Sequence, residues 1–388
     1  MPGRLPTLLG TFVIAAALLI GGAVSAYAVQ IVDLKGRTVS LEHPARKVLL
    51  GDGRFLLALA LLTRDPVSRV AGMLTDFESL DPDGFASFLA AYPALADVPV
   101  YGGTSAKNGT LESALATRPD VAIFGHGGHD LTPRSEQAIE MLTAAGVPIV
   151  FIDFRDNPIV NTPRSMRVLG QVIGLKAKAD AFAAFYESEV RKVTSRMVMY
   201  SGPRPTVFLD IRAGLSAECC FTIKSGMLAS LVEAAGGRNI AKSVLPDTAG
   251  LLKPEFVIAS NPGIYIGTAV GSRSRGWKPG GPIVLGAGVD EVLARRSLIS
   301  ATLRPDIGSL GAVDTGKAFG IWHHFSNSPM NVYALQKFAT WLHPELFADL
   351  DPEKTRAALM SRLLPAKLDG IYAIGTPPMT ENNPEQNQ

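Results

Sequence analysis

Hydrophobic and polar positions form two kinds of segment that alternate along the chain. Short runs rich in Val, Ile, Leu and Phe are typical of buried strands, and the stretches between them carry apolar residues at helical spacing. In the first half, the apolar runs predict strands at residues 47–50, 69–73, 98–101, 121–125 and 148–153. The intervening stretches predict helices at residues 54–62, 84–91, 111–117 and 135–145. This succession predicts an α/β fold whose mainly parallel sheet is buried between helices.

A long helical pattern separates this half from the next. Thr162 and Pro163 suit the N-cap and the first position of a helix that ends near Gly174. No Gly or Pro interrupts residues 176–200, so a helix of roughly 35 Å is expected at about 1.5 Å per residue. Its apolar face would consist of Ala179, Phe182, Tyr186, Val190, Val193 and Met197.

The alternation of strands and helices resumes after this helix. Strands are expected at residues 206–211, 264–268 and 317–322, and a helix at residues 225–235. The simplest arrangement is two related α/β lobes with central, mainly parallel sheets, joined by one long interlobe helix.

The first 28 residues have a pattern of their own. Arg4 precedes an apolar run from Leu8 to Val24, and Ala26-Tyr27-Ala28 is a small-residue cleavage signature. This order predicts a cleavable secretory signal peptide, and the alternative is a retained membrane anchor. No Cys stands near the cleavage point, so we expect a protein that is not a lipoprotein and is exported to the periplasm.

These patterns divide the chain into five parts. They are a signal peptide (1–28), an N-terminal α/β lobe (29–160), linking helices that include the long interlobe helix (161–202), a C-terminal α/β lobe (203–375) and a disordered tail (376–388).

Composition and charge exclude several classes of protein. Hydrophobic residues make up 47% of the 388, which is too many for a disordered chain. The net charge is +2 without a long basic run, which argues against a nucleic-acid partner. Two cysteines rule out a disulfide scaffold and a Cys-rich zinc module.

Two acidic residues occupy equivalent positions in the two halves. Glu112 stands seven residues before Pro119, and Glu255 stands seven residues before Pro262. In both cases an apolar helix lies between and a buried strand follows, so each Glu falls in a first helical turn, where the helix dipole favours it. They can be two unrelated acidic caps, or a matched pair for docking to a symmetric, basic partner.

With these landmarks the sequence resembles class III periplasmic binding proteins, the substrate-binding components of ABC importers for ferric siderophores, haem and cobalamin. Further landmarks are four short segments: Val32 to Val39, Leu169 to Leu175 with its Leu-Gly and Ile-Gly-Leu motifs, Ala234 to Ala241, and Trp341 to Phe347. The resemblance extends from about residue 32 to residue 370. Gly263 departs from it, because the family usually has Asp after the Pro.

The resemblance implies the function and the partners. It implies a ligand held between the lobes, and arginines of the importer's permease dimer in the inner membrane meeting Glu112 and Glu255. The segments from Asp210 to Thr222 and from Trp322 to Pro329 resemble a ferric-siderophore subgroup. The siderophore would supply the iron ligands, so we expect no cofactor of the protein's own, and iron only inside the bound complex. We expect a monomer.

Ligand-binding candidates are the charged and aromatic residues that follow strands, because ligands of such folds bind beyond the strand ends. Arg offers charge and forked donors to an anionic complex, and aromatic rings can stack on it. The candidates are Arg54, Tyr101, His126, Arg212, Arg273, Trp277, Trp322, His323 and His324. Arg273 belongs to a Gly-rich loop, where it can also be a solvated charge.

Three pairs leave alternatives open. His126 and His129 have the spacing of a metal pair, although no third ligand is evident. His323 and His324 would point to opposite sides of a strand, so at most one of them would face the ligand, where it could be an axial haem ligand; the alternative is a capping or packing role. Cys219 and Cys220 can form a vicinal disulfide, remain buried thiols, or act as a redox or metal pair.

An enzyme is the weaker hypothesis. The sequence contains no Walker A motif, Gly-x-Ser-x-Gly elbow or His-Glu-x-x-His motif. An exported hydrolase or metalloenzyme remains an alternative, because catalytic groups assemble in space. The sequence therefore predicts capture and delivery of a ferric siderophore, with haem or cobalamin as the alternative ligand.

Overall fold

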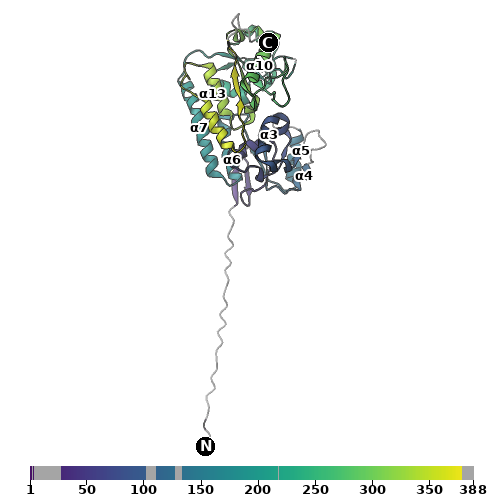
Figure 1. The fold of residues 1–388 in the computed structure, drawn as a ribbon. Helices are drawn as coiled ribbons and strands as arrows, with labels where there is room; N and C mark the ends of the chain where they lie inside the picture. Colours follow the sequence, from purple (N-terminus) through teal and green to yellow (C-terminus); the bar gives the residue numbers. More distant parts are fainter. Residues whose placement is uncertain (2, 4–27, 102–110, 127–132, 217, 378–388) are drawn as a thin grey trace.

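The structure, a computed structural model, describes residues 1, 3, 28–101, 111–126, 133–216 and 218–377. Two five-stranded sheets with flanking helices form an N-terminal lobe and a C-terminal lobe (Figure 1). The predicted α/β class with mainly parallel sheets is confirmed. Most of the predicted signal peptide, His129 and residues 378–388 of the predicted tail lie outside the described residues. Within the described residues, no helix combines the length and the hydropathy of a membrane span.

The sheet of the N-terminal lobe is entirely parallel, in the order β5-β4-β3-β6-β7. Its strands are β3 (Val48–Leu50), β4 (Val70–Leu74), β5 (Val100–Tyr101), β6 (Val121–Gly125) and β7 (Ile149–Ile152). The accompanying helices are α1 (Phe55–Ala60), α2 (Asp76–Leu80), α3 (Pro82–Ala91), α4 (Leu111–Leu115) and α5 (Pro133–Ala144), with the 3-10 turns η1 (Val67–Arg69) and η2 (Pro93–Asp97). An antiparallel hairpin of β1 (Val29–Val32) and β2 (Thr38–Leu41), which the hydrophobic pattern did not predict, precedes the sheet.

The sheet of the C-terminal lobe has the order β10-β8-β12-β14-β16, and its last strand is antiparallel. Its strands are β8 (Thr206–Asp210), β10 (Arg238–Asn239), β12 (Ile264–Ala269), β14 (Ala318–Trp322) and β16 (Ala373–Gly375). Two smaller antiparallel pairs are β9 (Phe221–Ile223) with β11 (Ala249–Leu251), and β13 (Gly286–Ala287) with β15 (Gly370–Ile371). The helices are α8 (Met227–Ala234), α9 (Pro254–Ser260), α10 (Glu291–Thr302), α11 (Pro305–Gly308), α12 (Gly311–Asp314), α13 (Asn331–Leu342) and α14 (Pro352–Leu363), with η3 (Ile240–Ser243) and η4 (His323–Asn327).

Two helices link the lobes, α6 (Pro158–Val172) and α7 (Lys176–Met199). The predicted start of the first of these helices at Thr162 was wrong, because Pro158 takes the first helical position and Pro163 lies inside the helix. The Asp153 carboxylate accepts hydrogen bonds from the backbone N–H of Arg155 and Asp156, which fixes the earlier start.

The long helix α7 presents its predicted apolar face to the core. All six predicted residues, from Ala179 to Met197, are at most 7% exposed. Tyr186 donates a hydrogen bond to Asn331 Oδ1 (2.7 Å), and Figure 1 shows α13 running beside α7. The interlobe helix is therefore anchored to a helix of the C-terminal lobe.

Near the carboxyl terminus, Thr376 is hydrogen-bonded to the sheet of the C-terminal lobe, although the prediction placed it in the disordered tail. Its backbone N–H donates to the Ala318 carbonyl at 2.9 Å. The ordered chain therefore continues past β16 to this residue.

Candidate functional site

Polar residues at the strand ends of the two lobes meet between the sheets. Asp52 follows β3, and its Oδ2 accepts a hydrogen bond from Asn327 Nδ2 of η4 at 2.7 Å. His324 of the same turn donates from Nε2 to the carbonyl of Leu80 at 3.1 Å. Because ligands of open α/β sheets bind beyond the carboxyl ends of strands, this contact region is the candidate site.

The N-terminal side of the site contains a buried ion pair. Arg54 donates from Nε and Nη2 to the Asp52 carboxylate at 3.0 and 2.5 Å, and its Nε lies 3.8 Å from Asp76 Oδ2. Burial raises the pKa of Asp52, but the Arg54 guanidinium outweighs it and holds that pKa below its usual value. Burial and the Asp52 charge raise the pKa of Asp76 well above its usual value. One positive and one negative charge therefore balance each other here.

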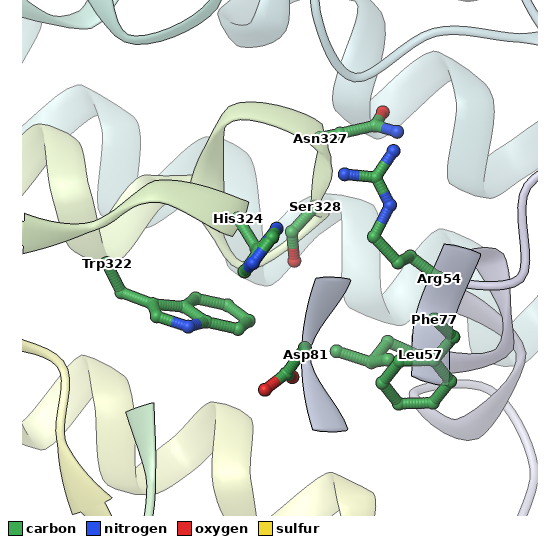
Figure 2. A pocket seen from close by; sticks show the side chains of 8 residues that line it. All are labelled: Arg54, Leu57, Phe77, Asp81, Trp322, His324, Asn327 and Ser328. Atoms are coloured by element: carbon green, nitrogen blue, oxygen red, sulfur yellow. The ribbon is translucent and has the colours of Figure 1, made fainter. Parts of the chain in front are cut away.

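A small cavity lies between the lobes beside this ion pair. Figure 2 shows Arg54 extending toward Asn327, with Trp322 and His324 on the other side of the cavity. The cavity volume is about 10 Å³, so the lobes are nearly in contact here. The lining residues are Arg54, Leu57, Phe77, Asp81, Trp322, His324, Asn327 and Ser328.

His324 and Trp322 are both buried at this cavity. Their rings pack edge to face at a centroid distance of 5.0 Å, and His324 is 5% exposed. Burial and the charge of Arg54 lower the pKa of His324 to about 3. The prediction that His323 and His324 point to opposite sides of a strand was wrong, because β14 ends at Trp322 and both histidines belong to η4.

A second group of residues brings positive charge to His323. Burial lowers the pKa of His323 well below its usual value, and the neighbouring His324 together with the charges of Arg155, Arg212 and Arg54 opposes protonation further. Arg155 comes from the N-terminal lobe and Arg212 from the C-terminal lobe. The imidazole is therefore held neutral near cations of both lobes.

Arg212 is held in an unusual backbone conformation after β8. Its φ of 57° lies in the left-handed region, which is uncommon for a residue with a long side chain. Its N–H donates to Thr268 Oγ1 at 2.6 Å, and its guanidinium carbon lies 5.4 Å from the Phe221 ring centroid. Thr268 Oγ1 also contacts His323 Nδ1 at 3.0 Å.

Arg155 was missed by the sequence analysis. Its carbonyl accepts a 2.5 Å hydrogen bond from Met227 N, and its Nη2 lies 3.7 Å from Met227 Sδ, so it contacts the C-terminal lobe. The signal that could have found it was the one used for Arg54 and Arg212: Arg155 stands two residues after the predicted strand 148–153.

The Gly-rich loop of the C-terminal lobe touches the helices of the N-terminal lobe. The backbone N–H groups of Arg273 and Ser274 donate to the Asp83 carboxylate at 2.6 and 3.2 Å. Arg275 donates from its guanidinium to the Ser79 carbonyl. Trp277 lies elsewhere, beneath Arg296 at 5.0 Å from the ring centroid. The structure therefore gives this loop an interlobe contact and leaves Trp277 outside the group around His323.

Tyr101 and His126 also differ from the rest of the predicted set. Tyr101 is 4% exposed and donates its hydroxyl to the Leu50 carbonyl at 2.8 Å, so its ring lies within the core. His126 follows β6, and its backbone N–H donates to the Ile152 carbonyl at 2.7 Å. Its predicted partner His129 lies outside the described residues. In the described parts of the chain, no three His, Cys, Asp or Glu side chains could hold a metal ion together.

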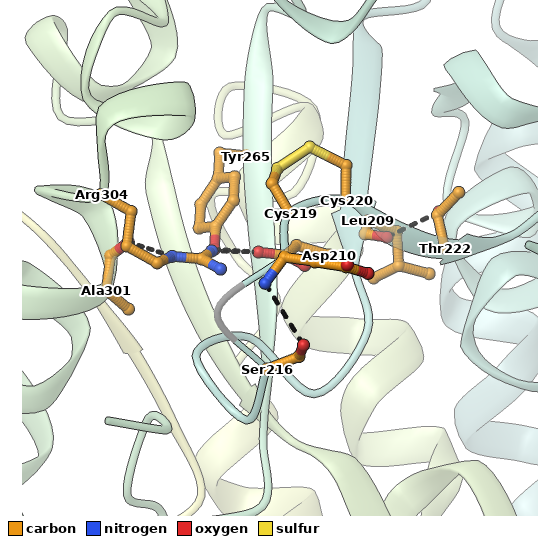
Figure 3. The surroundings of a disulfide bond; sticks show 10 residues. Leu209, Asp210, Ser216, Cys219, Cys220, Thr222, Tyr265, Ala301 and Arg304 are labelled. Carbon is orange, nitrogen blue, oxygen red and sulfur yellow. Dashed lines mark hydrogen bonds and ion pairs between the residues drawn. A yellow bond between two sulfur atoms is a disulfide. The ribbon is translucent and has the colours of Figure 1, made fainter. Parts of the chain in front are cut away.

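A larger cavity of about 260 Å³ opens beyond β8, lined in part by Arg212, Glu218 and Phe221. Its floor includes Asp210, which accepts hydrogen bonds from Tyr265 (2.8 Å) and from Arg304. Burial raises the pKa of Asp210, although Arg304 opposes the shift. Figure 3 shows this group beside Cys219 and Cys220, which a disulfide joins in the structure.

The two predicted docking residues lie on the surface. Glu112 stands in the first turn of α4 and Glu255 in the first turn of α9, and both residues are exposed. The strands β6 and β12 follow these helices, as the matched spacing predicted.

Comparisons with known proteins place the chain in a family. The model of the periplasmic binding protein family matches residues 80–276. No curated protein matches the sequence. Among solved structures, a TroA-like periplasmic binding protein, FepB, from Veillonella parvula has a TM-score of 0.76 and 25% identity, and the match covers 90% of this chain and 99% of that chain.

Two further structures share the fold at lower identity. The molybdate periplasmic binding protein MolA from Haemophilus influenzae has a TM-score of 0.62 and 16% identity, over 88% of this chain and 99% of that chain. A periplasmic heme binding protein from Pseudomonas aeruginosa has a TM-score of 0.53 and 17% identity, over 78% and 94%. The chain therefore belongs to the class III periplasmic binding protein family and is a solute-binding protein of the ABC-transporter type rather than an enzyme.

Proposed function

We propose that this protein binds a ferric siderophore between its lobes and delivers it to an ABC importer in the inner membrane. The proposal is supported by two arginines of opposite lobes at the interlobe contact: Arg155 reaches Met227 of the C-terminal lobe, and Arg212 shares the Thr268 hydroxyl with His323. Both bring positive charge to the surroundings of His323. Ferric siderophore complexes are often anionic, and guanidinium groups donate paired hydrogen bonds to anionic oxygens. The chelator would supply the iron ligands, so the protein would need no resident cofactor.

Ligand entry requires the lobes to move apart in this proposal. The interlobe cavity of about 10 Å³ is far smaller than the several hundred Å³ that a ligand of drug size occupies (roughly 300–1,000 Å³). The hydrogen bonds from Asn327 to Asp52 and from His324 to Leu80 would therefore break on opening. The mature chain would act as a periplasmic monomer after removal of residues 1–28, without nucleic acid as a partner.

Haem is the second candidate ligand. A neutral imidazole can be an axial ligand of haem iron, and the lowered pKa values of His323 and His324 keep both rings neutral. Cobalamin is the third candidate ligand.

A fluorescence titration would test these ligands. Trp322 lines the interlobe cavity, so a ligand bound there should quench its emission. We expect saturable quenching by a ferric siderophore from a panel of catecholate, hydroxamate and carboxylate complexes that also includes haem and cobalamin. A Soret shift with haem, and no quenching by any siderophore, would instead assign the protein to haem.

The same titration should show the role of the two arginines. Arg155→Ala and Arg212→Ala should each weaken binding of an anionic siderophore by about 1–3 kcal/mol, the value of a charged hydrogen bond. Arg191→Ala, on the exposed surface of α7, is the matched control and should leave the dissociation constant unchanged. If Arg155→Ala and Arg212→Ala both bound the siderophore with wild-type affinity, neither arginine would belong to the binding site.

We also propose that Glu112 and Glu255 dock the protein to the permease dimer. The double variant Glu112→Lys/Glu255→Lys should bind the siderophore with wild-type affinity and should abolish most uptake in cells, because a positive charge would face the permease arginines. Glu42→Lys/Glu345→Lys carries the same charge change on other exposed residues and is the control. Normal uptake by the Glu112/Glu255 variant would contradict the docking assignment.

A further inference from the structure

The hydroxyl of Thr268 connects two residues of the candidate site. Thr268 is fully buried near the end of β12, with 0% exposure. Its Oγ1 lies 2.6 Å from the backbone N of Arg212 and 3.0 Å from Nδ1 of His323. One side chain therefore touches both the residue that follows β8 and the turn that follows β14.

The hydrogen bonds of this hydroxyl fix where its proton points. The Arg212 N–H is a donor, so Thr268 Oγ1 must accept that bond. The hydroxyl hydrogen then needs an acceptor, since an unsatisfied donor in a buried site costs free energy. In the described structure, His323 Nδ1 is the acceptor in contact with Oγ1. Thr268 therefore donates to Nδ1.

This direction determines the tautomer of His323. A neutral imidazole carries one proton, and a nitrogen that accepts a hydrogen bond does not carry it. The proton is therefore on Nε2, on the opposite side of the ring from Thr268. The reverse tautomer would send two donors to Oγ1 and would leave the hydroxyl hydrogen without an acceptor. The neutral state agrees with the lowered pKa of His323, which burial and the nearby cations cause.

We propose that Thr268 is a positioning residue that holds His323 as its Nε2–H tautomer, so that His323 offers the ligand a hydrogen-bond donor. An Nε2–H group binds an anionic oxygen, and it has no free lone pair for an iron ion. The chain would thereby favour a chelated, anionic ligand over haem that needs an axial histidine at this position. The statement about the ligand rests on the proposed function, whereas the statement about the tautomer does not.

The tautomer can be measured without any ligand. In ¹⁵N-labelled full-length protein, long-range ¹H–¹⁵N correlation spectra distinguish a protonated ring nitrogen from an unprotonated one. We expect a protonated Nε2 and an unprotonated Nδ1 in the signals that His323→Gln removes. Thr268→Ser should keep this pattern, and Thr268→Val, which has nearly the same shape without the hydroxyl, should lose it. A protonated Nδ1 in the wild-type protein, or an unchanged pattern in Thr268→Val, would overturn the proposal.

Affinity measurements test the ligand part separately. Thr268→Val should weaken binding of the ferric siderophore by about tenfold, the value of one hydrogen bond to a charged acceptor, and Thr268→Ser should restore it. Equal affinity in both variants would overturn the specificity role even with the expected tautomer. If the spectra show Nε2–H and no siderophore binds to the wild-type protein, the tautomer assignment stands and the proposed function fails.

Discussion

Replacing Arg54 with Met should lower the free energy of unfolding by about 3–5 kcal/mol, the cost of leaving one charge of a buried pair without its partner. The side chains of Arg54 and Asp52 are only 12% and 11% exposed, so little solvent would reach the remaining carboxylate. Asp76 is a second carboxyl group beside Arg54, so the variant would leave two carboxyl groups without the Arg54 cation. Urea denaturation followed by circular dichroism would measure the loss.

A double variant separates charge imbalance from lost packing. Arg54→Met/Asp52→Asn removes both charges, so it should recover most of the stability that Arg54→Met loses. Lys354→Met, which breaks an exposed pair with Asp351, should cost less than about 1 kcal/mol. If Arg54→Met cost no more than this control, the buried pair would not contribute to stability.

The ion pair with Asp52 also changes the expectation for Arg54 as a ligand-binding residue. The sequence predicted a guanidinium available to an anionic ligand, and the structure pairs it with Asp52. A loss of affinity in an Arg54 variant therefore needs a stability measurement beside it.

Acid should destabilise the wild-type protein more than the His324→Gln variant. The pKa of His324 is about 3 in the folded state and 6.5 in the unfolded state, so the unfolded chain binds the proton more tightly. The contribution of the neutral His324 is complete above pH 6.5 and is lost as pH falls from 6.5 toward 3. Across that range the wild-type protein should lose about 1.4 kcal/mol per pH unit relative to the variant.

The comparison cancels an opposite effect in the same cavity. Burial raises the pKa of Asp81 to about 6, so its protonated form stabilises the folded state at low pH and that stabilisation is lost as pH rises from 3.8 through 6. Both proteins keep Asp81, so the difference between them reports His324. Urea denaturation at several pH values would give the two curves, with His43→Gln as a control for an exposed imidazole. Parallel curves from pH 7 to pH 4 would show that His324 is not held neutral.

Strands were predictable where burial was continuous along the chain. Residues 121–125 are all buried, and the prediction matches β6 at both ends. The long helix α7 was predicted to within one residue, because its apolar spacing is unbroken. Short strands such as β10 and β13 have two residues each, and their pairing depends on distant partners, so a local pattern could not reveal them.

The strand ends in the sequence selected candidate site residues but did not reveal their partners. The rule that a ligand lies beyond a strand selected Arg54, Arg212 and His323 as candidates, and the same rule applied to residues 148–153 would have selected Arg155. The rule also selected Tyr101, whose hydroxyl the structure gives to Leu50 within the core. Position along a strand places a residue at an edge, and it does not determine the direction of the side chain.

The sequence by itself determined the order of the elements, the two lobes, the interlobe helix and the paired first-turn glutamates, because hydrophobic spacing and helix-start residues act over a few neighbouring positions. The tertiary structure decided which distant side chains surround each cation. It placed Asp76 beside Arg54, brought Arg155 and Arg212 near one imidazole, and set Thr268 between Arg212 and His323. These partners are separated by 22 residues or more along the chain, and charge and hydrogen-bond energies depend on distances in space that only the packed lobes fix.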